Sequence, residues 1–301
     1  MILPCDMLPT FIGIGAPKAG TTWLSNALYD HPNICMPVRK ETDFFSYRYR
    51  DHSIEYYESL FECGEAPQAV GEFSTGYLSH PQVPARIASD LPGVRLLAVL
   101  RNPVEQVYSH YWHLQRQNFH TKDPRAAHLS FEEALVQFES RLVRPAQYAV
   151  HLDRWFAHFD RDRFLIHLFD DVQADPNGVV SSVYGFIGAD PTWRPSTVRE
   201  KGRQARAGTA PRSARAARWG SAAYHALNRY AYVPLKRVLG ENRAEALKNR
   251  LGVREALEVA FRTKGYPEMS GTTRRQLTER FTEPNSRLGE MLGRDLSHWN
   301  T

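Results

Sequence analysis

The sequence predicts an α/β fold in which a mostly parallel sheet is flanked by helices in three layers. Short apolar runs typical of buried strands occur at 11–15, 94–100 and 164–169. Segments with apolar residues at helical spacing follow these runs, so strands and helices alternate along the chain. This alternation indicates parallel strands joined by helical crossovers.

The expected helices are each supported by a local signal. His31-Pro32 ends the first helix, because proline lacks a backbone donor, and Asn102-Pro103 supplies an N-cap and a first helical residue. Ser130-Phe-Glu-Glu133 is a capping box. The helices predicted in this way lie at 22–30, from 103 onward, at 130–140, at 147–159 and at 172–187, and the C-terminal third is expected to be mostly helical.

Length and composition favour one domain over residues 1–301. The chain has 301 residues, of which 42% are hydrophobic, which is enough for a sizeable core. Its net charge of +5 suits an anionic ligand, whereas nucleic-acid-binding proteins are commonly more basic. We therefore expect no nucleic-acid partner.

The cysteines and histidines show no metal-binding spacing. Cys5, Cys35 and Cys63 form an odd set, and we expect them to be buried or unpaired thiols. The twelve histidines lack a convincing common face, so we predict no metal. No signal peptide and no apolar run of about 18 residues is visible, which makes a cytoplasmic protein without a membrane span the expectation.

A glycine-rich turn follows the first strand and has the layout of a phosphate-binding loop. From Gly15 the spacing fits G-x-x-x-x-G, but Thr21 and Thr22 stand where a nucleotide triphosphatase carries Lys and Ser/Thr. Lys18 lies inside the loop instead. Backbone amides at the start of the next helix would still bind an anion. The loop is therefore P-loop-like, but it suits a nucleotide whose own phosphorus is not the reacting centre.

A second candidate anion site follows the strand at 94–100. Arg101 stands where a metal-binding aspartate is common, and an arginine binds anions. Ser109 lies about two helical turns further on and could reach the same anion. Two such sites suggest a nucleotide with phosphates on both sides of its ribose.

These motifs resemble the sulfotransferase family that uses 3'-phosphoadenosine 5'-phosphosulfate (PAPS). Ala16–Thr22 is similar to its 5'-phosphosulfate loop, and Leu100–Ser109 is similar to its 3'-phosphate motif. Lys40–Ser46, Gly71–Tyr77 and Pro284–Trp299 resemble the glycan-modifying branch related to heparan sulfate sulfotransferases. The resemblance implies PAPS as the donor, 3'-phosphoadenosine 5'-phosphate (PAP) as its product, and no metal.

The resemblance also implies which residues bind the cofactor. They are Lys18, Ala19, Gly20, Thr21, Thr22, Trp23, Arg101, Ser109, Lys201, Gly202 and Arg203. The last three lie in a basic stretch, 199–218, which has seven basic residues against one acidic residue and reads as a loop before a helix. That stretch is either a cofactor lid or a solvated linker. The region at 219–263 matches nothing specific and is either a variable lid or helical core.

Sulfuryl transfer requires a base for the acceptor proton and a cation for the leaving phosphate. The resemblance gives the base role to Glu41, whose alternative is a surface ion pair with Lys40 or Arg39. It gives the cation role to Lys18.

The acceptor side follows from the resemblance to the glycan branch. The residues expected to bind the acceptor are Phe44, Glu72, Tyr77, Tyr148 and His151. Phe73 replaces the lysine that is usual beside Glu72, which weakens the case for a sulfated polysaccharide. His151 is either a replacement base or a satisfied histidine on a helix surface.

Two other functional classes stay open at this point: a P-loop kinase or NTPase, and a non-catalytic nucleotide- or glycan-binding module. Thr21 and Arg101 oppose the first class, and the joint presence of Lys18, Glu41, Arg101 and Ser109 opposes the second. Neither the acceptor, a hydroxyl or an amine of a small molecule or glycan, nor the oligomeric state follows from the sequence.

Overall fold

The computed structural model describes residues 8–64, 66–118, 129–196, 209–211, 226, 228–232, 234–235 and 262–301. Contacts divide the chain into two compact units. The first unit comprises the described residues within 1–107, 140–205 and 274–301, and the second comprises those within 108–139 and 206–273. A single domain over 1–301 stays a prediction.

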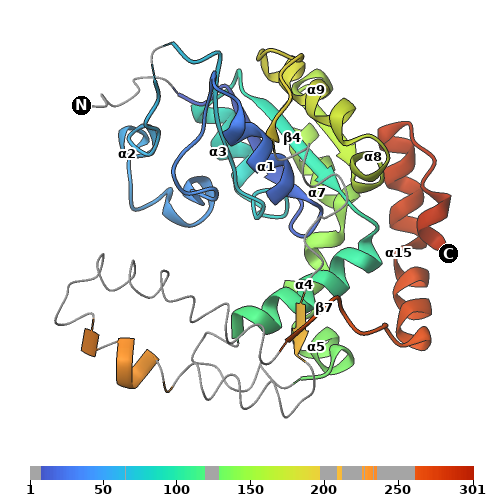
Figure 1. Ribbon diagram of the computed structural model, residues 1–301. Coiled ribbons are helices and arrows are strands. Elements are labelled where there is room, and N and C mark those ends of the chain that lie inside the picture. Colours follow the sequence, from blue (N-terminus) through green and yellow to red (C-terminus); the bar gives the residue numbers. More distant parts are fainter. Residues whose placement is uncertain are drawn as a thin grey trace. The chain divides into compact units, whose positions relative to one another are not determined.

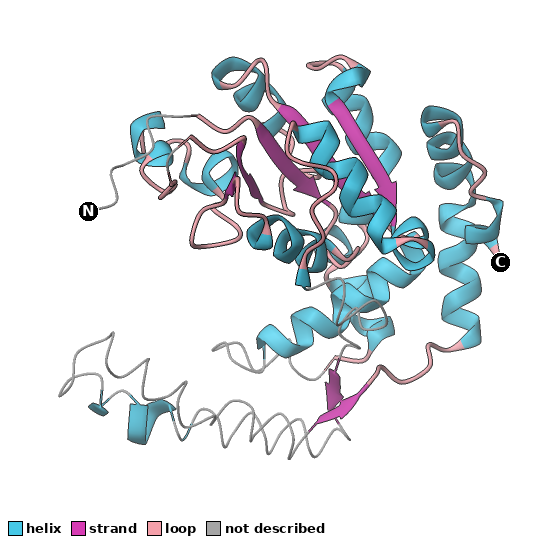
Figure 2. Cartoon of the chain, turned by 45° about the horizontal axis from the view of Figure 1, so that its top comes forward, coloured by secondary structure: helices cyan, strands magenta, loops and turns pink. Residues whose placement is uncertain are grey.

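A five-stranded sheet forms the centre of the first unit, and helices lie on both of its faces (Figures 1 and 2). All four strand pairs are parallel. In sheet order the strands are β2 (Ile34–Cys35), β3 (Ala69–Phe73), β1 (Phe11–Gly15), β4 (Arg95–Leu100) and β5 (Phe164–Leu168). The predicted α/β fold with a parallel sheet is confirmed.

The strand order reverses its direction at β1. From β1 the chain crosses to β2 on one side, and from β3 it crosses back over β1 to β4 on the other. Right-handed crossovers in opposite directions put their helices on opposite faces of the sheet. The carboxyl ends of the strands beside such a reversal form the usual binding crevice of open α/β sheets.

The sheet interior is apolar. Every residue of β1 and β3 is buried, and β4 is buried from Leu96 onward. Gly13 lets β1 pack against β3, because a Cβ at this position would lie 2.2 Å from the ring of Phe73. A continuous apolar strand of this kind is expected where both faces of a sheet are covered.

The helices of the first unit are α1 (Thr21–Asp30), α2 (Ile54–Glu58), α3 (Val83–Asp90), α7 (Tyr148–Phe156), α8 (Phe169–Ala174) and α9 (Pro176–Ile187), with short helical turns at Phe44–Arg48, Arg144–Ala146, Arg161–Arg163 and Ser297–Asn300. Of these helices, α1 and α7 begin within one residue of the predicted position, and α2 and α3 were not predicted. The single helix predicted at 172–187 is wrong. Asp175 accepts a hydrogen bond from the Gly178 amide and caps a new helix, whose first residue is Pro176.

Two helices contain residues of both units: α4 (Pro103–Asn118) and α15 (Gly271–Leu292). The second of these agrees with the expected helical C-terminal third, whereas most of 212–261 lies outside the described residues. In the second unit, Ser130 and Glu133 form the predicted capping box of α5 (Phe131–Gln137). The helix ends before 140, and α6 (Glu139–Leu142), shared by the two units, follows separately.

A small antiparallel sheet is an unpredicted feature of the second unit. Strand β6 (Thr209–Pro211) pairs with β7 (Arg262–Lys264). Residues 209–211 were expected in a loop, and they are extended because β7 supplies their hydrogen-bond partners. The remaining short element is a helical turn at Asn228–Tyr232. Within the described ranges, no helix is both long and apolar enough to cross a membrane.

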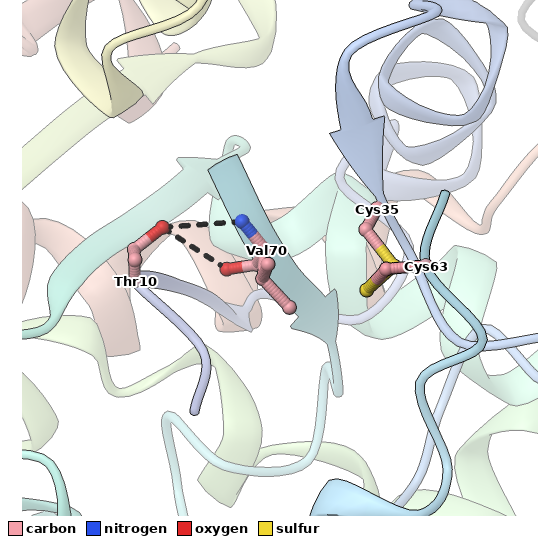
Figure 3. Close-up of a disulfide and its surroundings, with 4 residues drawn as sticks. All are labelled: Thr10, Cys35, Cys63 and Val70. Carbon is pink, nitrogen blue, oxygen red and sulfur yellow. Dashed lines mark hydrogen bonds between the residues drawn. A yellow bond between two sulfur atoms is a disulfide. The ribbon is translucent and has the colours of Figure 1, made fainter. Parts of the chain in front are cut away.

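The prediction of unpaired cysteines is wrong for two of the three. Cys35 and Cys63 form a disulfide with a Cα–Cα distance of 5.3 Å. Cys35 is paired with Val70 across β2 and β3, and Figure 3 shows Val70 between the disulfide and Thr10, whose hydroxyl hydrogen-bonds to the Val70 backbone. The sequence separation of 28 between the cysteines hides this proximity from sequence reasoning. Cys5 lies outside the described residues.

Candidate functional site

The loop between β1 and α1 is shaped by two residues in the left-handed backbone region. Gly20 has φ +90° and is the N-cap of α1, and Lys18 has φ +64°. The Ala16 amide donates to the Val99 carbonyl at 2.8 Å and so fixes the loop to β4. Because the N-cap is a glycine, Thr21 and Thr22 begin the helix and are not its capping residues. Their amides occupy the first turn, where intrahelical acceptors are lacking.

Two side chains that follow β4 hydrogen-bond to the backbone carbonyls of this loop, and an aromatic ring that follows β5 packs against one of them. Arg101 donates from Nη1 to the Lys18 carbonyl at 3.3 Å, and Gln106 donates from Nε2 to the Pro17 carbonyl at 3.1 Å. The Arg101 guanidinium also lies over the Phe169 ring, 5.1 Å from its centroid. A cation is thereby placed beside the loop at the carboxyl edge of the sheet, the position expected for an anion-binding arginine.

The segment that carries Glu41 reaches the same loop through Lys40. Lys40 Nζ lies 3.4 Å from Thr21 Oγ1 and 3.3 Å from Thr22 Oγ1, and it is 3.7 Å from Glu41 Oε1. Burial lowers the pKa of Lys40, and the neighbouring Glu41 carboxylate opposes this shift. A cation therefore stands at the first turn of α1, and its ion-pair partner is the Glu41 carboxylate.

Sequence reasoning treated Lys40 only as an ion-pair partner of Glu41 and missed its contact with the loop. Its sequence signals are its position next to Glu41 and its place at the start of the Lys40–Ser46 segment. Thr75 was also missed; its Oγ1 donates to Glu41 Oε1 at 3.1 Å. Nothing in the local sequence around Thr75 predicts this contact, because the two residues come from separate segments.

The five residues predicted to bind the acceptor are all buried. Phe44 stacks on Tyr57, with ring centroids 4.5 Å apart, and Glu72 and Tyr77 hydrogen-bond to each other at 3.0 Å. Burial raises the pKa of Tyr148. Their roles as acceptor contacts stay predictions.

His151 is buried on α7. The alternative that placed it on a helix surface is therefore wrong about its exposure. Arg154 donates to its Nδ1 at 2.9 Å, so the ring proton is on Nε2, which donates to the Arg144 carbonyl at 2.7 Å. Burial lowers the pKa of His151 to about 4, and the two nearby arginines add to the effect. Both ring nitrogens are thus satisfied by the protein in the neutral form.

The remaining predicted cofactor residues lie in different parts of the chain. Ala19 is buried in the first unit, and Trp23 is half-buried on α1. Ser109 belongs to the second unit, where its hydroxyl is 3.4 Å from the Tyr266 hydroxyl. Lys201, Gly202 and Arg203 lie outside the described residues, as does nearly all of the predicted lid at 199–218. Among the residues that the structure describes, no cluster of three His, Cys, Asp or Glu side chains could hold a metal ion.

Comparisons with known proteins identify the family. The sequence matches the sulfotransferase domain over residues 8–204. It is 32% identical to "Bifunctional heparan sulfate N-deacetylase/N-sulfotransferase 4" of Mus musculus and 31% identical to "Bifunctional heparan sulfate N-deacetylase/N-sulfotransferase 3" of Homo sapiens, over 204 residues in each case. Each alignment covers 62% of this chain and 23% of the relative, so the chain spans about a quarter of the length of these proteins.

A solved structure resembles the whole chain. The crystal structure of a sulfotransferase from Alicyclobacillus acidocaldarius is 24% identical and superposes with a TM-score of 0.68, covering 98% of this chain and 100% of that chain. At this identity the likeness supports the fold. The domain match covers more than half of the chain and includes the Gly15–Thr22 loop, Glu41 and Arg101. The chain therefore belongs to the sulfotransferase domain family of enzymes.

Proposed function

We propose that this protein transfers a sulfuryl group from PAPS to a hydroxyl, or alternatively an amine, of a small molecule or glycan. One observation carries the proposal: Lys40 contacts Thr21 and Thr22 at the first turn of α1 and forms an ion pair with the Glu41 carboxylate. Helix starts of this kind bind phosphates. A carboxylate placed at such a turn suits proton removal from an attacking group.

The roles of the side chains follow from the bonds that change. The S–O bond to the 5'-phosphate breaks, and its electron pair stays on the phosphate oxygen of PAP. A new bond forms between sulfur and the acceptor atom, whose proton goes to Glu41. Lys18 and Lys40 supply positive charge for the oxygen that becomes negative, and such charge is most effective when it is already in place.

Recognition of the 3'-phosphate is proposed for Arg101 and Ser109. Arg101 lies beside the loop, where it contacts the Lys18 carbonyl. A charge-assisted hydrogen bond from its guanidinium would distinguish PAP from adenosine 5'-monophosphate, which lacks the 3'-phosphate. Lys201, Gly202 and Arg203 are proposed as further contacts on the basis of the sequence.

The test combines binding with turnover. PAP formation from PAPS is measured with two acceptor probes, N-desulfated heparan oligosaccharide for an amine and 2-naphthol for a hydroxyl. Calorimetry compares PAP with adenosine 5'-monophosphate. We expect turnover with at least one probe and tighter binding of PAP. Equal affinities together with no PAP formation would contradict the proposed function.

Two substitutions assign the binding roles. Arg101→Ala is expected to raise the Kd for PAP by roughly 10- to 150-fold, as for the loss of a charged hydrogen bond. Arg95→Ala, at the exposed opposite end of β4, is the matched control and is expected to leave the Kd unchanged. Lys18→Ala is expected to weaken both PAP binding and turnover, because a cation beside the transferred group acts in the ground state and the transition state.

A further inference from the structure

Glu72 is a carboxylate buried inside the protein on β3, and its exposed fraction is 0%. The described residues direct five hydrogen bonds to it, and all five donors are neutral. Burial raises the pKa of Glu72, and the hydroxyl donors oppose the shift. Burying a carboxylate costs several kcal/mol, and apolar residues of similar volume are often as good for stability. A role in packing alone therefore explains Glu72 poorly.

The two oxygens of Glu72 have different partners. Oε1 accepts from the hydroxyls of Tyr57, at 2.9 Å, and Tyr77, at 3.0 Å. Oε2 accepts from the Thr42 hydroxyl at 2.7 Å, from the Thr42 amide at 3.3 Å and from the Ser74 hydroxyl at 2.6 Å. Only Oε2 therefore binds the residue that directly follows Glu41.

Glu72 Oε2 is also linked, through the Ser74 hydroxyl, to Asp43, the residue that follows Thr42. The Ser74 hydroxyl donates to Glu72 Oε2 and accepts from the Asp43 amide at 3.2 Å. Asp43 has φ +54°, a left-handed conformation that costs energy in a non-glycine residue and persists only where neighbours enforce it. Glu72 and Ser74 hold Asp43 in this conformation, on the C-terminal side of Glu41.

The Glu41 carboxylate is held by the continuation of the same segment. Thr75, which follows Ser74, donates to Glu41 Oε1 at 3.1 Å. The residues from Glu72 to Thr75 thus fix both the backbone after Glu41 and its side chain. Both the backbone beside the Glu41 carboxylate and the carboxylate itself are therefore held in place. Such placement matters in catalysis, because a misplacement of about 1 Å can cost about 100-fold in rate.

We propose that Glu72 is a positioning residue for sulfuryl transfer, whose Oε2 holds Thr42 and Asp43 and thereby directs the Glu41 carboxylate at the loop before α1. This inference rests on the function proposed above. In this role Glu72 acts through Glu41 and not directly on the cofactor. Its removal therefore lowers kcat and leaves cofactor binding intact.

The test compares substitutions on the two sides of the buried carboxylate. Glu72→Gln and Thr42→Val are expected to lower kcat for PAP formation by roughly 10- to 100-fold, with the Kd for PAP unchanged. Tyr57→Phe removes a hydrogen bond to Oε1 and is the matched control. It is expected to lower thermal stability while leaving kcat within about twofold of the wild type. Thr42→Val provides the answer if Glu72→Gln does not fold.

A double mutant shows whether Glu72 acts through Glu41. If it does, Glu41→Gln/Glu72→Gln is no slower than Glu41→Gln alone, because contacting residues that act as a unit are not additive. Fully additive losses would overturn the inference. So would normal turnover of Glu41→Gln, or equal loss of kcat in Thr42→Val and Tyr57→Phe at equal stability. A wild type that neither binds PAP nor turns over PAPS would instead contradict the proposed function itself.

Discussion

At the scale of single residues, the site depends on charged side chains that are partly buried. Lys40 lies between two threonine hydroxyls and the Glu41 carboxylate, and burial lowers its pKa. In such surroundings an ionic interaction is stronger than in bulk water. An anion bound at the first turn of α1 would therefore meet a cation that is already oriented.

The role of Glu41 is tested by removing its charge while keeping its shape. Glu41→Gln is expected to lower kcat by roughly 10²- to 10⁴-fold, the usual range for loss of a general base, and to keep the affinity for PAP. Turnover at saturating PAPS and calorimetry with PAP measure the two quantities. Glu55→Gln, on the exposed surface of α2, is the control. Near-normal turnover of Glu41→Gln would move the base role to another residue.

His151 makes folding stability depend on pH. Its pKa falls from 6.5 to about 4 on folding, because burial disfavours the charged ring and Arg154 repels it. Below pH 6.5 the unfolded chain binds a proton that the folded protein does not, so the stabilising contribution present above pH 6.5 is lost progressively down to about pH 4. The loss is at most about 3 kcal/mol.

Urea denaturation across this pH range measures the effect. His151→Gln keeps a donor for the Arg144 carbonyl and cannot be protonated. Its stability is expected to fall less steeply than that of the wild type between pH 6.5 and 4. Parallel curves for the two proteins would show that His151 does not titrate in this way.

At the scale of elements, the segment between β2 and α2 is fastened at both ends. The Cys35–Cys63 disulfide closes a span that contains Lys40, Glu41 and the aromatic turn Phe44–Arg48. Within that span, Phe44 and Phe45 pack against Tyr57 of α2. The disulfide restricts the conformations of this span in the unfolded chain, and the aromatic contacts order it in the folded protein.

Breaking the disulfide is expected to destabilise the protein. In the chain-entropy account, a cross-link across 28 residues contributes about 3 to 4 kcal/mol. Cys35→Ser/Cys63→Ser, or a reducing agent added to the wild type, should therefore lower the denaturation midpoint. Cys5→Ser is the control and should leave the midpoint unchanged. An unchanged midpoint in the double variant would contradict the prediction.

At the scale of the whole molecule, cofactor binding should be visible as stability. A ligand that binds only the folded protein contributes about 2.7 kcal/mol at 100 times its Kd, which corresponds to a rise in Tm of a few degrees. We expect this shift with PAP, a smaller one with adenosine 5'-monophosphate, and no change in either on adding EDTA. Loss of the PAP shift in EDTA would contradict the prediction of a metal-free site.

The cellular location follows from neither the fold nor the site. The sequence leads us to expect a cytoplasmic protein, yet disulfides persist mainly in oxidising compartments. Thiol labelling of Cys35 and Cys63 in lysates quenched with acid would decide between the two. Free thiols in cells would mean that the disulfide forms only after exposure to air.

Local sequence patterns predict those parts of the protein that depend on neighbours in the chain. The strand, loop and helix from Phe11 to Asp30 and the capping box of Ser130 lie where their local signals predict, because an apolar run, a turn glycine and a capping pair are each patterns of residues close together in the chain. Only the tertiary structure decided the contact of Lys40 with Thr22, the pairing of Cys35 with Cys63 and the burial of His151. Each of these depends on segments that parallel strand pairing and helix packing bring together, and no local pattern of residues encodes such a meeting.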